Sequence, residues 1–364
     1  MRILISGGGT GGHIFPALAI AEAIRRVQPS AELLFVGARG KMEMQIVPKH
    51  GYAIEGLWIR GWNRRSIRSN VLFPLRLATS LYQAWRIIRR FRPHVAIGTG
   101  GYAAGPALEI AYRYKVPIVL QEQNSYPGWT NRLLAKKAAA ICVAYPEMER
   151  YFPKDKIHLT GNPVREKIAH NRYTPEEARK RLGLNPMRPT LVVIGGSLGA
   201  KTLNEAVAKS YELLKRHVDD VQILWQVGKG YWDVYKDSDV AALPSVVVVP
   251  FVDDMAAAYR AASIVISRAG AIAISEIAAT PSAAIFVPSP NVAENHQYKN
   301  AEALVKYNAA AMIDDQRAVN DALPMALQYL QQEDLLATWR KNIASFYRPN
   351  AAQRIAEIAI QLSQ

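Results

Sequence analysis

The sequence of 364 residues predicts an α/β protein with two doubly wound domains that face a cleft, each a parallel sheet covered by helices on both faces. Short, continuously apolar segments alternate with longer segments of helical periodicity, and such apolar strands are typical of parallel sheets. The pattern of strand, glycine turn and helix that opens the chain, RILISGGGTGG, occurs again near the middle as LVVIGGSLGA. The strand series therefore begins twice, once in each domain.

The expected strands follow in chain order. In the first half they are RILIS, ELLFVG, HVAIG, PIVLQ and AICVA, and in the second half LVVIGG, VQILWQV, VVVVPFV, SIVIS and AAIFVP. The polar segment that begins GNPVREKIAH contains proline and has no strand character, so we place the domain boundary between Asn162 and Pro163. The predicted domains are residues 1–162 and 163–346, and the amphipathic C-terminal helix 347–364 is expected to pack back on the first domain.

The net charge of +15 indicates an anionic partner, such as nucleic acid, a membrane surface or a phosphorylated substrate. Zinc-ligand spacing and an RNP motif are absent, which argues against nucleic acid. The single cysteine, Cys142, excludes an internal disulfide and is consistent with a reducing compartment. No apolar stretch approaches the ~18 residues of a membrane span and no signal peptide is recognisable, so we expect a soluble, cytoplasmic chain.

Basic residues concentrate in a window without Asp or Glu between Glu55 and Glu109, where arginines are interleaved with aromatic residues. We expect a helix over 72–91 with a polar arginine stripe and a nearly opposite apolar stripe that faces the core. The polar stripe consists of Arg76, Thr79, Gln83, Arg86 and Arg90, and the core stripe of Leu77, Leu81, Ala84 and Ile88. Cationic and aromatic side chains together are typical of contacts with anionic lipid, although a solvated basic face is the alternative. The candidate membrane contacts are Tyr82, Trp85, Arg86 and Arg89.

The first glycine loop matches the dinucleotide-binding pattern GxGxxG at Gly7, Gly9 and Gly12. That pattern requires an acidic residue at the end of the second strand. Ala38 and Arg39 stand there instead, so only a weak NADP interpretation through Arg39 remains.

The second glycine loop, GGSLGAKT, differs by one residue from the Walker A motif, because Ala200 stands where that motif has glycine. Bare amide groups and the helix dipole at such a turn suit an anion. We therefore expect a phosphate site, and a tight turn that binds nothing is the alternative. The site would consist of Gly195, Gly196, Ser197 and Gly199.

Other segments carry polar groups that suit a sugar nucleotide. A third glycine turn lies over 98–105, and residues 121–124 end a strand with side chains suited to hydroxyls. Glu276 lies on a helix opened by Gly270, where a carboxylate would accept from both ribose hydroxyls or merely favour the helix start. The polar residues 294–300 would contact a sugar or simply begin a helix.

Several motifs occur in one order along the chain: GGGTGGHIFPALAIAEAI, GTGGYAAGP, EQNSYPGWTNRLLAK, GNPVR, GGSLGAKTLN, PFVDDMAAAYRAA, SRAGAIAISEIAA and HQYKNA. In this combination, from Arg2 to about Ala303, the chain resembles the MurG family, bacterial transferases that add N-acetylglucosamine to lipid I and give lipid II of peptidoglycan. The resemblance implies a GT-B architecture of two Rossmann-like domains facing an interdomain cleft. A GT-B enzyme with another lipid acceptor and a UDP-sugar epimerase are the alternatives.

The resemblance also implies partners and location. The C-terminal domain would bind UDP-N-acetylglucosamine (UDP-GlcNAc), and the N-terminal domain would take lipid I and face the membrane. The enzyme would work without a cofactor, peripherally on the cytoplasmic face of the inner membrane, in cell division and cell shape. Other cell-wall synthesis proteins are possible partners.

Site residues are implied in the same way. From the N-terminal domain, Thr10, Gly11, Gly12 and Asn124 would approach the sugar. In the other domain, Arg165 and Ser197 would hold the pyrophosphate, Val252 would meet uracil through its backbone, and Gln297 would contact sugar hydroxyls. The nucleotide would be lined by Ala271, Ile272, Ala273, Ile274, Ser275 and Glu276, with Glu276 on the ribose. Two departures from the family pattern are Thr280-Pro281-Ser282, where Gly-Leu-Pro is common, and His296, where a first Gln is usual.

The reaction expected is an inverting displacement by the acceptor's C4 hydroxyl. His13 would be its general base or contact a phosphate, and a structural histidine that caps the turn is an equal alternative. The glycines before it are expected to let the acceptor approach the backbone, because a Cβ would obstruct it. We expect no metal, because no acid-x-acid pattern ends a strand and the adjacent Asp253 and Asp254 would point to opposite sides if extended.

Overall fold

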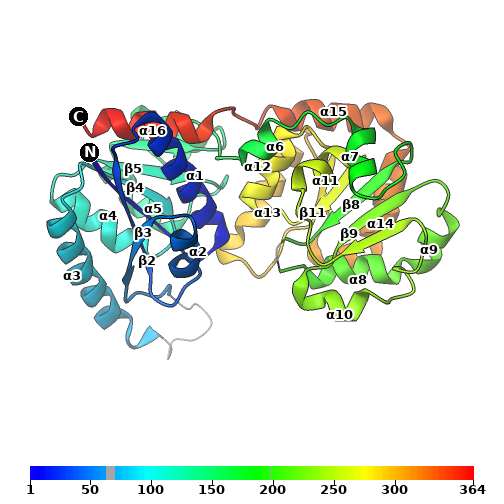
Figure 1. Cartoon of the computed structure of the whole chain (residues 1–364), viewed down its shortest axis with the longest axis horizontal. Helices are drawn as coiled ribbons and strands as arrows, with labels where there is room; N and C mark the ends of the chain where they lie inside the picture. The colour runs from blue at the N-terminus through cyan, green and yellow to red at the C-terminus, as the bar shows by residue number, and fades with distance from the viewer. Residues whose placement is uncertain (63–69, 197) are drawn as a thin grey trace. The chain divides into compact units, whose positions relative to one another are not determined.

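The computed structural model describes residues 1–62, 70–196 and 198–364, and the chain divides into two compact units (Figure 1). Unit 1 contains Met1–Val164 and Arg348–Gln364, and unit 2 contains Arg165–Tyr347. Each unit has a parallel sheet with helices on both faces. The predicted doubly wound α/β class is therefore confirmed.

Unit 1 is built on a seven-stranded sheet in the order β3-β2-β1-β4-β5-β6-β7. The strands are β1 (Arg2–Gly7), β2 (Glu32–Ala38), β3 (Ala53–Leu57), β4 (Val95–Gly100), β5 (Ile118–Glu122), β6 (Ala140–Val143) and β7 (Ile157–Leu159). The edge strands β3 and β7 were not expected from the sequence. Both lie at an edge of the sheet and are partly exposed. Their sequences therefore do not need the continuous apolar run by which the central strands were predicted.

The helices of unit 1 include the C-terminal segment of the chain. They are α1 (Gly11–Val27), α2 (Glu43–Lys49), α3 (Phe73–Phe91), α4 (Ala104–Arg113), α5 (Trp129–Leu134) and α16 (Ala351–Leu362). Figure 1 shows α16 beside α1, and Ile355, Ala356 and Ala359 are buried in the same core cluster as the apolar face of α1. The last helix is thus held to the first unit by apolar packing.

Unit 2 has a six-stranded sheet in the order β10-β9-β8-β11-β12-β13 around a core that contains Trp225. The strands are β8 (Thr190–Ile194), β9 (Gln222–Gln226), β10 (Val246–Val249), β11 (Ile264–Ser267), β12 (Ala284–Phe286) and β13 (Ala311–Met312). The helices are α6 (Glu166–Ala169), α7 (Pro175–Arg181), α8 (Lys201–Lys209), α9 (Tyr211–Arg216), α10 (Trp232–Tyr235), α11 (Met255–Ala261), α12 (Ala271–Ala279), α13 (His296–Lys306), α14 (Asp315–Leu330) and α15 (Glu333–Ala344).

Both sheets reverse their strand order at a central pair. The pair is β1 and β4 in unit 1, and β8 and β11 in unit 2. Ligands of open parallel sheets bind outside the carboxyl ends of strands at such a switch point. All three glycine loops follow strands of these pairs, so the fold places them where a ligand is expected.

The helix expected over 72–91 is α3, but its buried face differs from the expected one. Ser80, Ala84, Ile87 and Ile88 are buried, whereas Leu77, expected in the core, is 37% exposed. The buried positions begin at Ser80, so the first two turns of α3 have no core beneath them and expose apolar side chains. Arg64, Arg65 and Arg68 of the basic window lie outside the described residues.

Among the helices of the described ranges, none has the length and apolar character needed to cross a bilayer.

Candidate functional site

The glycine loop after β1 is anchored by a buried carboxylate that the sequence patterns did not reveal. Glu43, at the start of α2, accepts hydrogen bonds from the Gly9 N–H at 3.1 Å and from the Ala38 N–H, which ends β2, at 3.0 Å. It lies close to the sheet edge where the dinucleotide pattern requires its acid, but it binds backbone of the chain itself. The signal was present as an acid in the first turn of the helix after β2.

Packing explains the first glycines of this loop better than access of a substrate does. A Cβ at Gly7 would lie 2.0 Å from the Thr99 hydroxyl, and one at Gly8 would lie 2.2 Å from the Glu43 carboxylate. At Gly12, by contrast, the nearest such atom is the Thr10 hydroxyl at 3.6 Å. Packing alone thus requires glycine at Gly7 and Gly8, and the expectation that these glycines let the acceptor approach the backbone stays a prediction.

His13 lies in the first turn of α1 with its ring against the third glycine turn. Its Nδ1 is 3.2 Å from the Gly8 carbonyl oxygen and 3.2 Å from the Thr10 hydroxyl. Because a carbonyl oxygen only accepts, Nδ1 carries the hydrogen in this contact. The neutral ring then has its lone pair on Nε2, which is the tautomer that a general base requires. The ring packs on Gly100, whose φ is 95° and where a Cβ would lie 2.9 Å from the His13 Cδ2.

The polar residues that end β5 are mostly structural. Gln121, Glu122 and Gln123 are buried, and Gln123 donates to the Thr99 carbonyl oxygen at 2.7 Å. The interpretation of these three as ligands for hydroxyls is therefore wrong, since the fold itself satisfies them. Asn124 is partly exposed.

Glu122 holds Asn124 in place. Its Oε1 accepts from the Asn124 N–H at 3.0 Å and from the Asn124 side-chain amide at 3.2 Å, and its Oε2 accepts from Gly128 N–H and from Asn131. Burial raises the pKa of Glu122, and these hydrogen bonds oppose the rise. A buried carboxylate thus fixes Asn124, which the family resemblance predicts to approach the sugar.

The second glycine loop, between β8 and α8, is fixed by neutral groups. Gln226 donates to the Gly196 carbonyl oxygen at 2.9 Å, and Asn204 donates to the Val227 carbonyl oxygen at 2.9 Å. Gly199 has φ of 79°, and a Cβ there would lie 2.1 Å from the Val227 oxygen. The predicted phosphate ligand Ser197 lies outside the described residues.

Arg165 and Glu276, predicted to hold the pyrophosphate and the ribose, are brought together in unit 2. The Arg165 Nε and Nη2 donate to the two carboxylate oxygens of Glu276 at 2.7 and 3.1 Å. Glu276 is 4% exposed, and its burial raises its pKa against the opposing effect of Arg165. The Tyr259 hydroxyl lies 3.4 Å from the same carboxylate.

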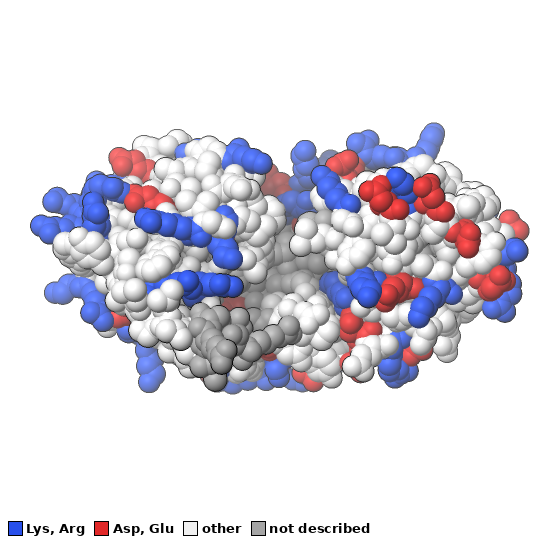
Figure 2. All heavy atoms as spheres, turned by 90° about the horizontal axis from the view of Figure 1, so that it is seen from below, with Lys and Arg blue, Asp and Glu red and all other residues white. Residues whose placement is uncertain are grey.

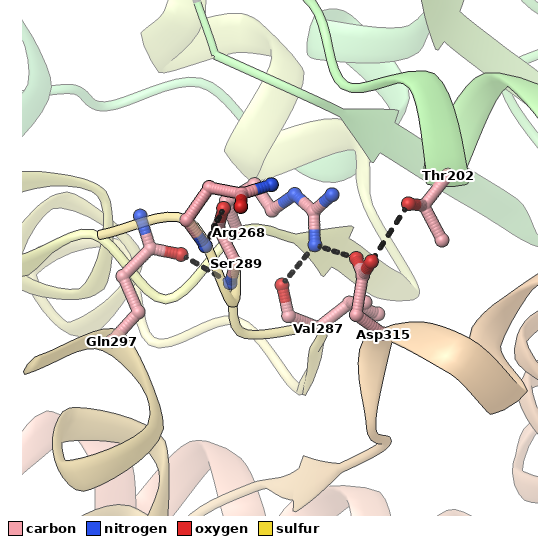
Figure 3. Close-up of polar contacts among 7 residues, drawn as sticks. Thr202, Arg268, Val287, Ser289, Gln297 and Asp315 are labelled. Carbon is pink, nitrogen blue, oxygen red and sulfur yellow. Dashed lines mark hydrogen bonds and ion pairs between the residues drawn. The ribbon is translucent and has the colours of Figure 1, made fainter. Parts of the chain in front are cut away.

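Gln297, the predicted sugar contact, is oriented by the backbone. Its Oε1 accepts from the Ser289 N–H at 2.8 Å, in the loop after β12 (Figure 3). This contact fixes which end of the amide is the oxygen and directs the NH₂ group away from Ser289. Gln297 therefore offers donors rather than an acceptor to a ligand.

The other nucleotide residues lie at neighbouring loops of unit 2. Val252 is buried in the loop between β10 and α11, and the six residues Ala271–Glu276 form the first turns of α12. The segment Thr280-Pro281-Ser282, which differs from the family pattern, lies past the C-terminal end of α12. The Thr280 hydroxyl donates a hydrogen bond to the Glu276 carbonyl oxygen at 3.0 Å. Among the described residues no group of His, Cys, Asp and Glu has a metal-binding arrangement.

The predicted membrane contacts gather on α3. Tyr82, 58% exposed, stacks on Trp85 with ring centroids 5.6 Å apart, and Arg89 lies 5.4 Å above the Trp85 ring. Arg86 is also exposed. Sequence reasoning missed the exposed apolar residues before and along the first turns of α3, which are Val71, Leu72, Leu75 and Leu77. The visible face of unit 1 carries many Lys and Arg side chains with few Asp or Glu between them (Figure 2).

The chain is similar to known glycosyltransferases over its full length. Residues 3–143 match the glycosyltransferase family 28 N-terminal domain, and residues 190–355 match the family 28 C-terminal domain. The chain is 49% identical over 366 residues to the UDP-N-acetylglucosamine--N-acetylmuramyl-(pentapeptide) pyrophosphoryl-undecaprenol N-acetylglucosamine transferase of Bacteroides fragilis, covering 100% of this chain and 96% of that protein. It is 48% identical over 361 residues to the transferase of the same name from Cytophaga hutchinsonii, covering 99% and 96%.

A solved structure gives the same result. The crystal structure of Acinetobacter baumannii MurG matches with a TM-score of 0.80 and 27% identity and covers 99% of both chains. The predicted GT-B fold is thereby confirmed.

Proposed function

The chain belongs to the MurG family of glycosyltransferases, and from this premise we propose that it transfers N-acetylglucosamine from UDP-GlcNAc to the C4 hydroxyl of N-acetylmuramic acid in lipid I. The products are lipid II and UDP. The observation that carries the proposal is 49% identity to a transferase of that name over the whole chain. The residues of the candidate site support it.

In unit 2, the donor's diphosphate would lie at the start of α8 and its ribose at Glu276. Amide groups and the dipole of this helix favour an anion. A carboxylate has about four acceptor positions, and Arg165 and the Tyr259 hydroxyl take three of them, so Glu276 has one left for a ribose hydroxyl. Arg165 and the helix start would stabilise the negative charge that develops on the leaving diphosphate.

In unit 1, His13 would act as the general base. The acceptor's C4 oxygen forms a bond with the anomeric carbon while the bond from that carbon to the diphosphate oxygen breaks, and UDP leaves with the electron pair. The hydroxyl proton goes to the Nε2 of His13, whose Nδ1–H points at the Gly8 carbonyl oxygen. His13→Ala should lower kcat at least about 100-fold. Turnover that stays intact in this variant would exclude the role.

The membrane surface is the further partner that we propose, because the acceptor is a lipid. The exposed apolar start of α3 would enter the interface, with Tyr82, Trp85, Arg86 and Arg89 beside it against anionic head groups. This arrangement supports peripheral binding to the cytoplasmic face of the inner membrane. Other cell-wall synthesis proteins stay a prediction.

The test of this function is UDP release from UDP-GlcNAc with and without a lipid I analogue. We expect release that depends on the analogue and yields a disaccharide product. Release without an acceptor, or isomerisation of the sugar at C2, would contradict the transferase function and favour an epimerase. Equal rates with a different lipid acceptor would contradict the specificity for lipid I.

A further inference from the structure

Asp315, at the start of α14, joins neighbouring strand ends of the unit 2 sheet (Figure 3). Its Oδ2 accepts a hydrogen bond from the Thr202 hydroxyl on α8 at 3.1 Å, and its Oδ1 pairs with Arg268, which directly follows β11. The same Arg268 Nη1 donates to the Val287 carbonyl oxygen, directly after β12, at 3.0 Å.

These contacts span four adjacent strands. Thr202 follows β8, Arg268 follows β11, Val287 follows β12 and Asp315 follows β13, and the sheet has these strands in that order. One carboxylate and one guanidinium thus connect the starts of α8 and α14 with the loops after β11 and β12 at the carboxyl edge. We call Thr202, Arg268, Val287 and Asp315 the loop clamp.

The two charged side chains of the loop clamp are mostly buried, so water screens their attraction only weakly. The Arg268 and Asp315 side chains are 15% and 22% exposed. A charge-assisted hydrogen bond in such a setting is stronger than a surface ion pair, and removal of one partner leaves the other charge poorly solvated. A favourable acid at a helix start would by itself explain Asp315, but not its simultaneous contacts with α8 and with Arg268.

The loops that the clamp connects are the loops of the proposed donor site. The first leads into α8 and the expected diphosphate position. The second leads through Gly270 into α12 and Glu276, and the third contains Ser289, whose N–H orients Gln297. Asp315 itself has no predicted contact with the donor.

We propose that Asp315 is a positioning residue for the donor site, which sets the spacing of the loops that bind the diphosphate, the ribose and the sugar. The proposal rests on the proposed function, because it concerns how UDP-GlcNAc is held. Loss of the carboxylate charge would uncouple the start of α8 from Arg268 and leave Arg268, among the described residues, held only by its hydrogen bond to the Val287 carbonyl oxygen. We therefore expect the variant to weaken binding of the donor and not binding of the acceptor.

The experiment compares Asp315→Asn with Asp321→Asn in the full-length chain. Asp321 lies on the same helix, and its ion pair with Arg317 is solvent-exposed. We expect the KM for UDP-GlcNAc to rise about tenfold in Asp315→Asn, with the KM for a lipid I analogue unchanged, and to stay within about twofold in Asp321→Asn. Equal effects of the two variants, or a parallel rise of both KM values, would overturn the proposal.

A second pair of variants tests one arm of the clamp even where Asp315→Asn does not fold. Thr202→Val removes the hydroxyl at similar volume, whereas Thr202→Ser keeps it. We expect the KM for UDP-GlcNAc to rise about threefold in the first and to be unchanged in the second. Identical KM values in the two would contradict the role of this arm. Failure of the unaltered chain to turn over UDP-GlcNAc would refute the proposed function instead, and titration with UDP alone would then still show whether Asp315 positions a nucleotide site.

Discussion

The glycine loops after β1 and after β8 follow the first strand of each unit, but they are anchored by groups of different charge. The loop after β1 is held by the buried carboxylate of Glu43, which accepts a hydrogen bond from the Gly9 N–H. The loop after β8 is held by the neutral amide of Gln226 at Gly196. A carboxylate beneath a loop repels an anion, and it accepts a hydrogen bond from a backbone N–H that the anion would otherwise use. A neutral side-chain amide that donates to a carbonyl oxygen does neither.

The two loops are thus suited to different ligands. A diphosphate is favoured at the second loop, where helix α8 begins. At the first loop an anion would have to use the amides at the start of α1, at Gly11 and Gly12, rather than that of Gly9. Similar glycine patterns in a sequence therefore do not indicate equal affinity for phosphate.

The largest effect on stability is expected from placing a side chain between the first and third glycine turns. Gly101 has φ of 84°, and a Cβ there would lie 2.3 Å from the Gly8 carbonyl oxygen, so Gly101→Ala should cost about 3 kcal/mol in the free energy of unfolding. Gly12→Ala should change it by less than about 1 kcal/mol while lowering kcat/KM. Denaturant unfolding and turnover of both variants check this, and equal stability of the two would contradict the packing account.

The charge difference between the loops can be removed by one substitution. Gln226→Glu places a carboxylate under the second loop, and we expect the KM for UDP-GlcNAc to rise about tenfold as the carboxylate repels the diphosphate. Gln226→Met is the control, since it removes the hydrogen bond to Gly196 without adding charge. A rise in KM that is the same for both variants would show that charge beneath the loop is unimportant.

The buried carboxylate of Glu122 should make the stability of unit 1 depend on pH. Its pKa is raised by burial, so its protonated form is favoured in the folded chain. The stability it contributes is present below the pKa of the unfolded chain and is lost as pH rises through the raised folded value, with a slope of about 1.4 kcal/mol per pH unit between the two pKa values. The unfolding free energy of the unaltered chain relative to Glu122→Gln should therefore fall as the pH rises above the ordinary carboxyl pKa of 4.5. A difference that is constant or rises with pH would contradict this sign.

The smallest effect is expected at the membrane surface of unit 1. Arg86→Gln and Arg89→Gln should each weaken binding to vesicles with anionic lipid by about 1 kcal/mol at low salt, and less at high salt. Arg216→Gln, an exposed substitution in unit 2, is the matched control. Co-sedimentation measures the effect, and equal retention of all three variants would argue for a solvated basic face on α3.

The sequence was informative where a pattern has one physical cause. Continuous apolar strands and glycine turns before helices predicted both sheets, and the family motifs predicted residues that the structure brings together, such as Arg165 and Glu276. It was uninformative where a polar residue serves the fold. Glu43 accepts hydrogen bonds from the backbone N–H groups of Gly9 and Ala38, and Glu122 accepts one from that of Gly128. No local spacing in the sequence distinguishes such an acid from a ligand for a sugar.

The exposure of Leu77 and the contacts of Asp315 were missed for a related reason. Helical periodicity identifies a face, but not where along the helix the core begins. Asp315 contacts Thr202, which lies more than a hundred positions earlier in the chain, and also contacts Arg268. Both contacts depend on the strand order of the sheet, which hydrophobic periodicity does not predict.

The difference between the two glycine loops is tested most directly by a crystal structure with UDP-GlcNAc bound. We expect the diphosphate at the amide groups that open α8, with the ribose on Glu276. A nucleotide bound at the loop after β1, above Glu43, would contradict this expectation.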